Sequence, residues 1–334
     1  MKRLVALAAA LAAVAVAGAG GTYVSCRGAG VGCSNSYLFL PDPARPVDPL
    51  VSVRGERRRE RGGVYMVDIL VRKATLVERV FPGLVDGASL VPAHAVNPVG
   101  VSEQERRRES LHEMSRSQEI AVAVALRSLG RHVRVDRTGA EVVTVFPGTP
   151  AAGALEVGDV IVEANNHRVR SPEELREAMG EVRPGDDVEL EIRRGEKRTT
   201  LRLATIASDR DRRAVVGVGV QQAAEFDFPV DVDIDAGDVG GPSAGLAFAL
   251  DVVDEVGPPD VDDGRRIVVT GELELDGDVL AIGGIKQKTI GAREAGADLF
   301  VVPEANAREA RKYAGGLEIL AVTTFDDALS HLTK

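Results

Sequence analysis

A serine in a glycine-rich turn and a lysine in a second glycine-rich segment are the residues best suited to chemistry. Ser243 lies within Gly240-Gly-Pro-Ser-Ala-Gly245, and Lys288 ends the segment Gly283-Gly-Ile-Lys-Gln-Lys288. A serine hydroxyl is a poor nucleophile at neutral pH and needs a neighbour that removes its proton. No histidine has comparable surroundings, so a lysine is the remaining base. Burial that lowers a lysine pKa by about three units leaves roughly a quarter of the amine neutral at pH 7.

Two lysines compete for that role, because Lys286 and Lys288 are two positions apart and face different ways on a helix. The residues at helical spacing after Lys288 are all small, which suits tight burial of its side chain. They are Gly291, Ala292 and Ala295. Lys286 is followed at the same spacing by the larger Thr289, Ile290 and Arg293. The pattern favours Lys288 as the base.

The residues after Ser243 predict a buried helix that begins at or just after the Gly-Gly-Pro turn. They read Ala-Gly-Leu-Ala-Phe-Ala-Leu-Asp-Val-Val-Asp, a long apolar run. The Ser243 hydroxyl would then lie at a helix N-terminus, where unpaired N–H groups and the helix dipole stabilise a developing oxyanion. The motif therefore has the parts that acyl transfer needs.

These segments, in this order, resemble the proteolytic domain of the Lon protease family over about Val215 to Leu332. The resemblance also includes Val269-Thr-Gly-Glu272 and Gly277-Asp-Val-Leu-Ala-Ile-Gly-Gly284. It implies that Ser243 is the catalytic serine and Lys288 the catalytic lysine. It also implies that Thr270 orients the lysine amine, and Glu272 matches the family as well. One position departs from the pattern: many Lon proteases carry an acidic residue where this chain has Gly240.

A preceding segment, about Arg131 to Thr205, resembles a bacterial PDZ domain. It alternates strands with glycine and proline turns, including Leu155-Glu-Val-Gly-Asp159 and Arg183-Pro-Gly-Asp186. Such domains bind an extended peptide by strand addition, often through backbone N–H groups that hold a terminal carboxylate. The resemblance places Gly139 and Ala140 in that binding loop. A purely structural or protein-docking role for the segment is the alternative.

The start of the chain predicts a membrane anchor. Lys2 and Arg3 precede an uncharged stretch of 23 residues, Leu4 to Cys26, which is long enough to cross a bilayer as a helix. The leading cations favour a cytoplasmic N-terminus, with the rest of the chain outside the cell membrane. A cleaved signal peptide and a secreted protein form the alternative, because Ala17-Gly-Ala19 resembles a cleavage site. Cys26 and Cys33 would then lie in an oxidising compartment, where they can pair.

The intervening region, 27–130, carries less information about function. Ser36 to Pro49 contains four prolines and is expected to be irregular, whereas Val64 to Val80 alternates enough to suggest one or two strands. Ser102 to Leu129 predicts a long helix whose apolar residues recur at helical spacing and pack in a core, and Gly130 can end it.

Composition narrows the classes of partner and cofactor. A net charge of −10 argues against nucleic acid binding, and no zinc-ligand spacing appears. No Gly-x-x-x-x-Gly-Lys-Ser/Thr phosphate loop occurs either, so ATP is not implied and no cofactor is expected.

Together these patterns predict an α+β multidomain protein. We expect an N-terminal transmembrane helix (1–26), an extracytoplasmic region with strands and a long helix (27–130), a PDZ-like β-rich domain (131–205) and a Lon-type α/β proteolytic domain (206–334). The expected function is an ATP-independent serine endopeptidase that cleaves unfolded or membrane-proximal proteins. The Lon resemblance also implies a homo-oligomer, commonly a hexamer. Alternatives are a peptide-binding scaffold with an inactive protease-like domain, or an enzyme that mainly cleaves itself.

Overall fold

A computed structural model describes residues 36–54, 63–96, 102–208, 211–257 and 261–333. The chain divides into two compact units. Among the described residues, the smaller unit comprises 36–39 and Val71–Val96, and the larger comprises Leu40–Leu70 and the chain from Ser102 onward. Within these described segments, no helix is both long and apolar enough to cross a membrane. The anchor predicted for Leu4 to Cys26, together with Cys26 and Cys33, lies outside them.

The smaller unit contains a small sheet and short helices. A three-stranded sheet has the order β5-β1-β6, with β1 (Ser36–Pro41) antiparallel to β6 (Ser89–Pro92), and β5 is Ile69–Lys73. Between β5 and β6 lie α2 (Leu76–Val80) and the 3-10 turn η2 (Pro82–Leu84), and α3 is Ala93–Val96. The expectation of an irregular stretch from Ser36 was therefore wrong, because β6 supplies hydrogen bonds that the prolines alone did not suggest.

The larger unit contains a five-stranded sheet in the order β2-β4-β16-β19-β20. The strands are β2 (Arg45–Pro46), β4 (Gly63–Met66), β16 (Arg266–Val269), β19 (Leu299–Pro303) and β20 (Glu318–Val322). Neighbours from β4 to β20 are parallel, and β2 is antiparallel to β4. Both faces of a parallel sheet are normally covered, so the sequences of its strands are continuous apolar runs.

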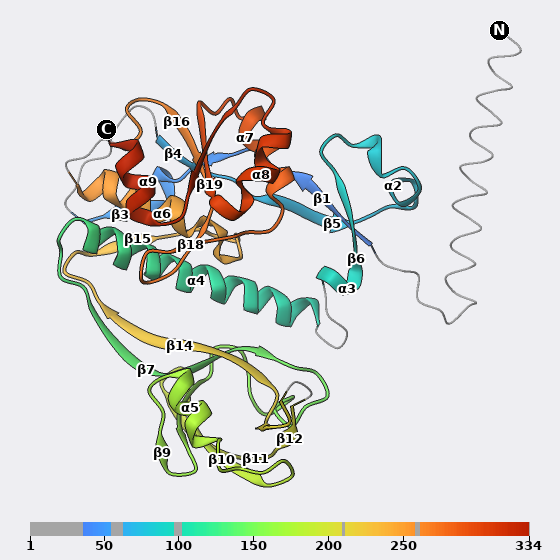
Figure 1. Cartoon of the computed structure of the whole chain (residues 1–334), viewed down its shortest axis with the longest axis vertical. Coiled ribbons are helices and arrows are strands. Elements are labelled where there is room, and N and C mark those ends of the chain that lie inside the picture. Colours follow the sequence, from blue (N-terminus) through green and yellow to red (C-terminus); the bar gives the residue numbers. More distant parts are fainter. Residues whose placement is uncertain (1–35, 55–62, 97–101, 209–210, 258–260, 334) are drawn as a thin grey trace, which may run out of the picture. The chain divides into compact units, whose positions relative to one another are not determined.

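Successive residues of β19 confirm this two-sided burial. Leu299 and Val301 belong to one apolar cluster with residues of α4 (Glu103–Ser128), α6 (Gly245–Val256) and α9 (Phe325–Leu332). Phe300 and Val302 belong to another cluster with residues of α7 (Ile285–Glu294) and α8 (Glu304–Tyr313). The sheet is thus the middle layer of an α/β sandwich (Figure 1).

Shorter elements complete this domain. Strand β3 (Val51–Val53) pairs with β15 (Val232–Ile234), and β17 (Glu272–Leu273) pairs with β18 (Val279–Leu280). Two 3-10 turns are η1 (Asp48–Leu50) and η3 (Pro242–Ala244). The long helix predicted from the sequence is confirmed as α4, which begins at a capping box formed by Ser102 and Glu105 and is followed by Gly130 in the left-handed region.

The core of the α/β domain extends beyond the range 206–334 in which the sequence placed it. Val47, Val64 and Met66, together with α4, are buried in the same apolar cluster as α6. Local sequence patterns do not reveal that these short early segments belong to this core, because β16, which pairs with β4, lies some 200 positions later. The domain is therefore discontinuous.

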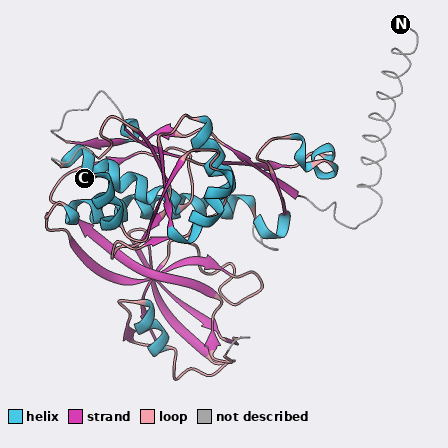
Figure 2. Cartoon of the chain, turned by 45° about the horizontal axis from the view of Figure 1, so that its top comes forward, coloured by secondary structure: helices cyan, strands magenta, loops and turns pink. Residues whose placement is uncertain are grey.

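The β-rich domain is inserted between α4 and β15. Its sheet has the order β11-β10-β8-β7-β14. The elements are β7 (Arg134–Val145), β8 (Val160–Ala164), β9 (His167–Arg168), α5 (Pro172–Ala178), β10 (Asp187–Arg194), β11 (Lys197–Ala204), β12 (Ile206–Ala207), β13 (Ala214–Val215) and β14 (Val218–Asp227). Strand β14 pairs antiparallel with β7 over its whole length, so this sheet continues past the predicted end at residue 205. Figure 2 shows a domain built mostly of strands with one short helix.

Candidate active site

The backbone around Ser243 is held from one side by the turn that follows β16. Gly241 has a φ of +88°, which allows the chain to turn before η3. The Ser243 carbonyl accepts hydrogen bonds from the Gly271 N–H at 2.9 Å and the Thr270 Oγ1 hydroxyl at 3.1 Å. The predicted buried helix is confirmed as α6, which begins at Gly245. The serine is therefore fixed at the start of a buried helix.

Lys288 reaches this serine from α7. The helix begins after Gly284, which has a φ of +69°, and the lysine is 3% exposed. Its Nζ donates to Ser243 Oγ at 2.7 Å and to Thr270 Oγ1 at 3.1 Å. The three residues singled out by the sequence motifs thus converge, although Ser243 and Lys288 are 45 positions apart.

Burial alters the protonation of this amine. Desolvation lowers the pKa of Lys288 to about 8, and the carboxylate of Asp68 opposes the shift. An amine with that pKa is about 9% neutral at pH 7, compared with well under 0.1% for an exposed lysine. The site therefore supplies a usable fraction of base near neutral pH.

Small residues make this burial possible. Gly291 packs so closely on the chain that a Cβ there would lie 2.2 Å from the Asp42 carbonyl oxygen, and Ala292 is fully buried. Lys286 instead lies on another side of α7, with its Nζ 5.7 Å from the ring centre of Tyr313. The two lysines therefore have different surroundings, as helical spacing requires.

Glu272 is half-buried near the site. Partial burial, and then the neighbouring Glu274, raise the pKa of its carboxyl. Among the described residues it makes none of the hydrogen bonds that join Ser243, Thr270 and Lys288.

Helix α4 holds the serine loop from the other side, and sequence reasoning treated this helix only as core packing. The Ser110 carbonyl accepts from the Gly241 N–H at 2.8 Å, and the buried Ser117 Oγ donates to the Pro242 carbonyl at 3.1 Å. These two serines are seven positions apart and so share a face of the helix. Their spacing was the only feature of the sequence that could have indicated this contact with the serine loop.

The same helix explains why Gly240 departs from the family pattern. A Cβ at position 240 would lie 2.3 Å from Ser110 Oγ and 3.0 Å from its Cβ. A side chain at this position would require the Ser110 hydroxyl to rotate away and α4 to shift slightly, so glycine allows the helix to lie close to the serine loop.

The opposite side of α4 contacts the inserted domain. Glu141 of β7 binds His112 Nε2 at 2.8 Å and Arg116 Nη1 at 3.2 Å. Thr144 Oγ1 donates to Glu109 Oε1 at 3.0 Å. One helix therefore joins the serine loop to a strand of the inserted sheet.

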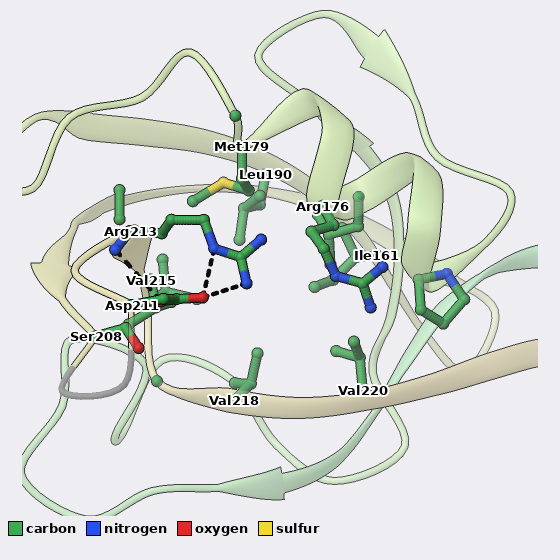
Figure 3. Close-up of a pocket in the computed structure, with 16 residues that line it drawn as sticks. Ile161, Arg176, Met179, Leu190, Ser208, Asp211, Arg213, Val215, Val218 and Val220 are labelled. Atoms are coloured by element: carbon green, nitrogen blue, oxygen red, sulfur yellow. Dashed lines mark hydrogen bonds and ion pairs between the residues drawn. The ribbon is translucent and has the colours of Figure 1, made fainter.

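The inserted domain has its own pocket, between α5 and the chain from Asp211 to Val220 (Figure 3). The cavity measures about 310 Å³, and its lining is mainly apolar. Ile161, Met179, Val218 and Val220 surround it, and Arg213 forms an ion pair with Asp211 at one side. An apolar slot of this size between a helix and a strand suits an extended peptide with an apolar side chain.

Gly139 and Ala140 do not line this pocket. Both lie in β7, which at this point pairs with β14 on one edge and with β8 on the other. Its backbone is therefore occupied, and a Cβ at Gly139 would lie 2.6 Å from the Ile161 carbonyl oxygen. The segment beside the pocket is instead 213–220, which includes β13 and the start of β14. It follows the predicted end of the domain at residue 205, and the sequence pattern did not reveal that it belongs to the domain.

Comparison with known proteins agrees with this division. The family model described as "PDZ domain" matches residues 127–205, and that described as "Lon protease (S16) C-terminal proteolytic domain" matches residues 203–334. The chain thus combines a PDZ domain with a Lon-type proteolytic domain.

Relatives of the proteolytic part are Lon proteases. The chain is 32% identical to a Lon protease of Rickettsia bellii over 155 residues, which cover 42% of this chain and 20% of the relative. It is 34% identical to Lon protease 2 of Bacillus subtilis, covering 32% of this chain and 18% of the relative. The chain therefore spans about a fifth of the length of these relatives.

Among solved structures, the PDZ domain of an SdrC-like protein from Listeria monocytogenes is similar to part of this chain. It is 25% identical in sequence to this chain, with a TM-score of 0.24, and the match covers 25% of this chain and 87% of that chain.

The lowered pKa of Lys288 predicts a distinctive pH dependence. For a site in which the neutral amine is the base, the rate of peptide cleavage should rise about tenfold between pH 7 and pH 9, as the neutral fraction rises from about 9% to about 91%. The measurement is kcat/KM for a fluorogenic peptide across this range, with Lys286→Ala as the control that keeps the profile. A rate that is flat or falls over this interval would contradict the assignment.

Removing the Ser117 hydroxyl should misplace the serine loop without unfolding the protein. Ser117→Ala leaves the Pro242 carbonyl without its donor, and we expect kcat to fall roughly tenfold, because small misplacements of reacting groups are costly. Ser128→Ala is the matched control, since its hydroxyl bonds only within α4, to the Ala125 carbonyl. Equal kcat for both variants would show that Ser117 does not position the loop.

Proposed function

We propose that this protein is an ATP-independent serine endopeptidase that uses a Ser243–Lys288 dyad. The observation that carries the proposal is the buried 2.7 Å contact between Lys288 Nζ and Ser243 Oγ. The Lon-type proteolytic domain supports the same class of reaction.

The reaction follows from this geometry. The neutral Lys288 amine takes the proton of Ser243 as Oγ attacks a peptide carbonyl, and the resulting ammonium gives the proton to the leaving amine. Water then hydrolyses the acyl-enzyme, with the same amine as base. Thr270 Oγ1 accepts a hydrogen bond from Lys288 Nζ and donates one to the Ser243 carbonyl, so it holds the lysine amine beside the serine.

The start of α6 offers stabilisation to the tetrahedral intermediate. The N–H groups of Ser243 and Ala244 in η3 lie at the N-terminal end of this buried helix, where the helix dipole favours negative charge. Gly240 and Gly241 carry no side chains that would obstruct the substrate backbone. These features support stabilisation of an oxyanion that develops beside Ser243.

The PDZ domain supplies recognition of an extended peptide. In this proposal the groove between α5 and β14 receives an apolar residue of the substrate, and strand addition at the edge of β14, which is the last strand of its sheet, holds the substrate backbone. Without the phosphate-loop motif the chain has no sequence signal for an unfolding motor. We therefore infer that the substrates are unfolded, flexible or close to the membrane.

The setting of this activity is also proposed from sequence. The apolar stretch Leu4 to Cys26 would anchor the chain in the cell membrane, with its N-terminus in the cytoplasm and the protease outside. A hexameric ring is the assembly that the Lon relationship suggests, and light scattering of the purified chain measures it.

Removal of either dyad member should abolish cleavage. Ser243→Ala and Lys288→Ala should each lower the rate of hydrolysis of an unfolded protein by on the order of a thousandfold or more, because the two groups act as one unit. Lys286→Ala is the matched control and should keep full activity, with circular dichroism showing that all three variants are folded. Full activity of Lys288→Ala would overturn the dyad.

A charge in the PDZ groove should separate recognition from chemistry. Met179→Glu puts a carboxylate into the apolar lining, so peptides with an apolar C-terminus should bind at least tenfold more weakly. Phe146→Glu, at a side chain that is 51% exposed and outside the pocket, is the control. Fluorescence anisotropy of labelled peptides measures both, and unchanged binding to Met179→Glu would place the peptide site elsewhere.

A further inference from the structure

The smaller unit exposes a cluster of large apolar side chains at one tip. We define the apolar tip as Val77, Val80, Phe81, Leu84 and Val85, which belong to α2, to η2 and to the residues beside them. Four of these side chains are between 59% and 67% exposed, and Val85 is 37% exposed. Ten large hydrophobic residues are exposed among the described parts of the chain, so half of them fall within nine positions.

The tip is built to present these side chains outward. Thr75 and Glu78 form a capping box at the start of α2, and Arg72 of β5 binds Glu78 with its guanidinium. The Arg72 guanidinium and the Thr75 hydrogen bonds hold the pKa of Glu78 at about 2, so this contact is ionic at all physiological pH values. Glu78 is therefore bound to the strand, whereas Val77 and Val80 of the same helix are exposed to solvent. This is the reverse of the usual orientation of a surface helix.

We propose that the apolar tip inserts into the interfacial region of a phospholipid bilayer. The inference rests on the proposed membrane anchor, because residues 27–35 are the only chain between the apolar stretch Leu4 to Cys26 and β1. Nine residues span at most about 30 Å when fully extended. An anchor at Leu4 to Cys26 would therefore tether the smaller unit close to the outer face of the cell membrane. The predicted anchor and the apolar tip both belong to the N-terminal part of the chain.

The size and composition of the tip favour lipid over a protein partner. A stable protein interface takes about 20–30 residues from each side, and five side chains fall far short of that. Valine, leucine and phenylalanine on a short helix suit the boundary between headgroups and acyl chains, where burial of apolar area gives the affinity. Arg79 of α2 adjoins the tip, and its positive charge complements anionic headgroups, whereas the charge of Arg72 is balanced by Glu78.

The chain contains no tryptophan, which makes a direct test possible. Phe81→Trp introduces a single reporter in the full chain, reconstituted into vesicles of phosphatidylcholine and phosphatidylglycerol. We expect its emission to shift to shorter wavelength and to be quenched about twofold or more by lipids with brominated acyl chains, as for an interfacial side chain. Leu84→Trp should behave in the same way. Phe146→Trp, at the exposed phenylalanine of the PDZ domain, is the control and should not be quenched by the brominated lipids.

Each other outcome overturns the inference in a distinguishable way. If the chain sediments with vesicles but both tip reporters stay unquenched, the anchor stands and the lipid contact of the tip is wrong. If the chain does not sediment with vesicles, the proposed anchor and the tip contact both fail, although the peptidase assignment does not depend on either. A blue shift that appears in detergent, grows with protein concentration and resists brominated lipid would show that a second copy covers the tip.

Discussion

The arrangement of the active site depends on keeping the Lys288 amine out of water. Burial lowers the pKa of this group to about 8, and the same burial makes its protonated form costly for the fold. Because the pKa in the folded chain lies below that in the unfolded chain, this group's contribution makes the fold more stable as pH rises from about 8 towards 10.5. At neutral pH, burial of this amine therefore lowers the stability of the fold and leaves part of the amine uncharged.

The surrounding elements are arranged to bury that amine and to aim the serine at it. Gly291 lets α7 lie against the chain near Asp42, and the β16–β17 turn holds Ser243 through Thr270 and Gly271. Helix α4 holds the serine loop from the other side through Ser110 and Ser117. The same helix also binds Glu141 of β7, so it contacts both the serine loop and the inserted domain.

Local patterns in the sequence predicted those features that depend on nearby residues. The glycine-rich motifs, the buried helix after Ser243 and the capped helix from Ser102 are all local, and the structure contains α6 and α4 where they were expected. The small residues after Lys288 indicated which lysine faces inward, because helical spacing is fixed. Lys288 lies beside Ser243, whereas Lys286 lies against Tyr313.

Features that depend on distant pairing were not visible in the sequence. Strand β4 is four residues long, and its role in the α/β sheet becomes evident only when β16 pairs with it. Strand β14, beside the groove, lies beyond the segment that resembles a PDZ domain, and Gly139 and Ala140 lie in β7, which pairs with β14 on one edge and with β8 on the other. The steric reason for Gly240 likewise needs α4, which comes some 130 positions earlier in the chain.

Direct titration of the Lys288 amine tests the central claim most directly. In the folded protein labelled with ¹³C at the lysine ε-carbon, the resonance assigned by its absence in Lys288→Ala should titrate with a pKa of about 8. Lysines exposed to solvent should titrate near 10.4 in the same sample. A Lys288 resonance that titrates with those exposed lysines would mean that the amine is charged at neutral pH and cannot serve as the base.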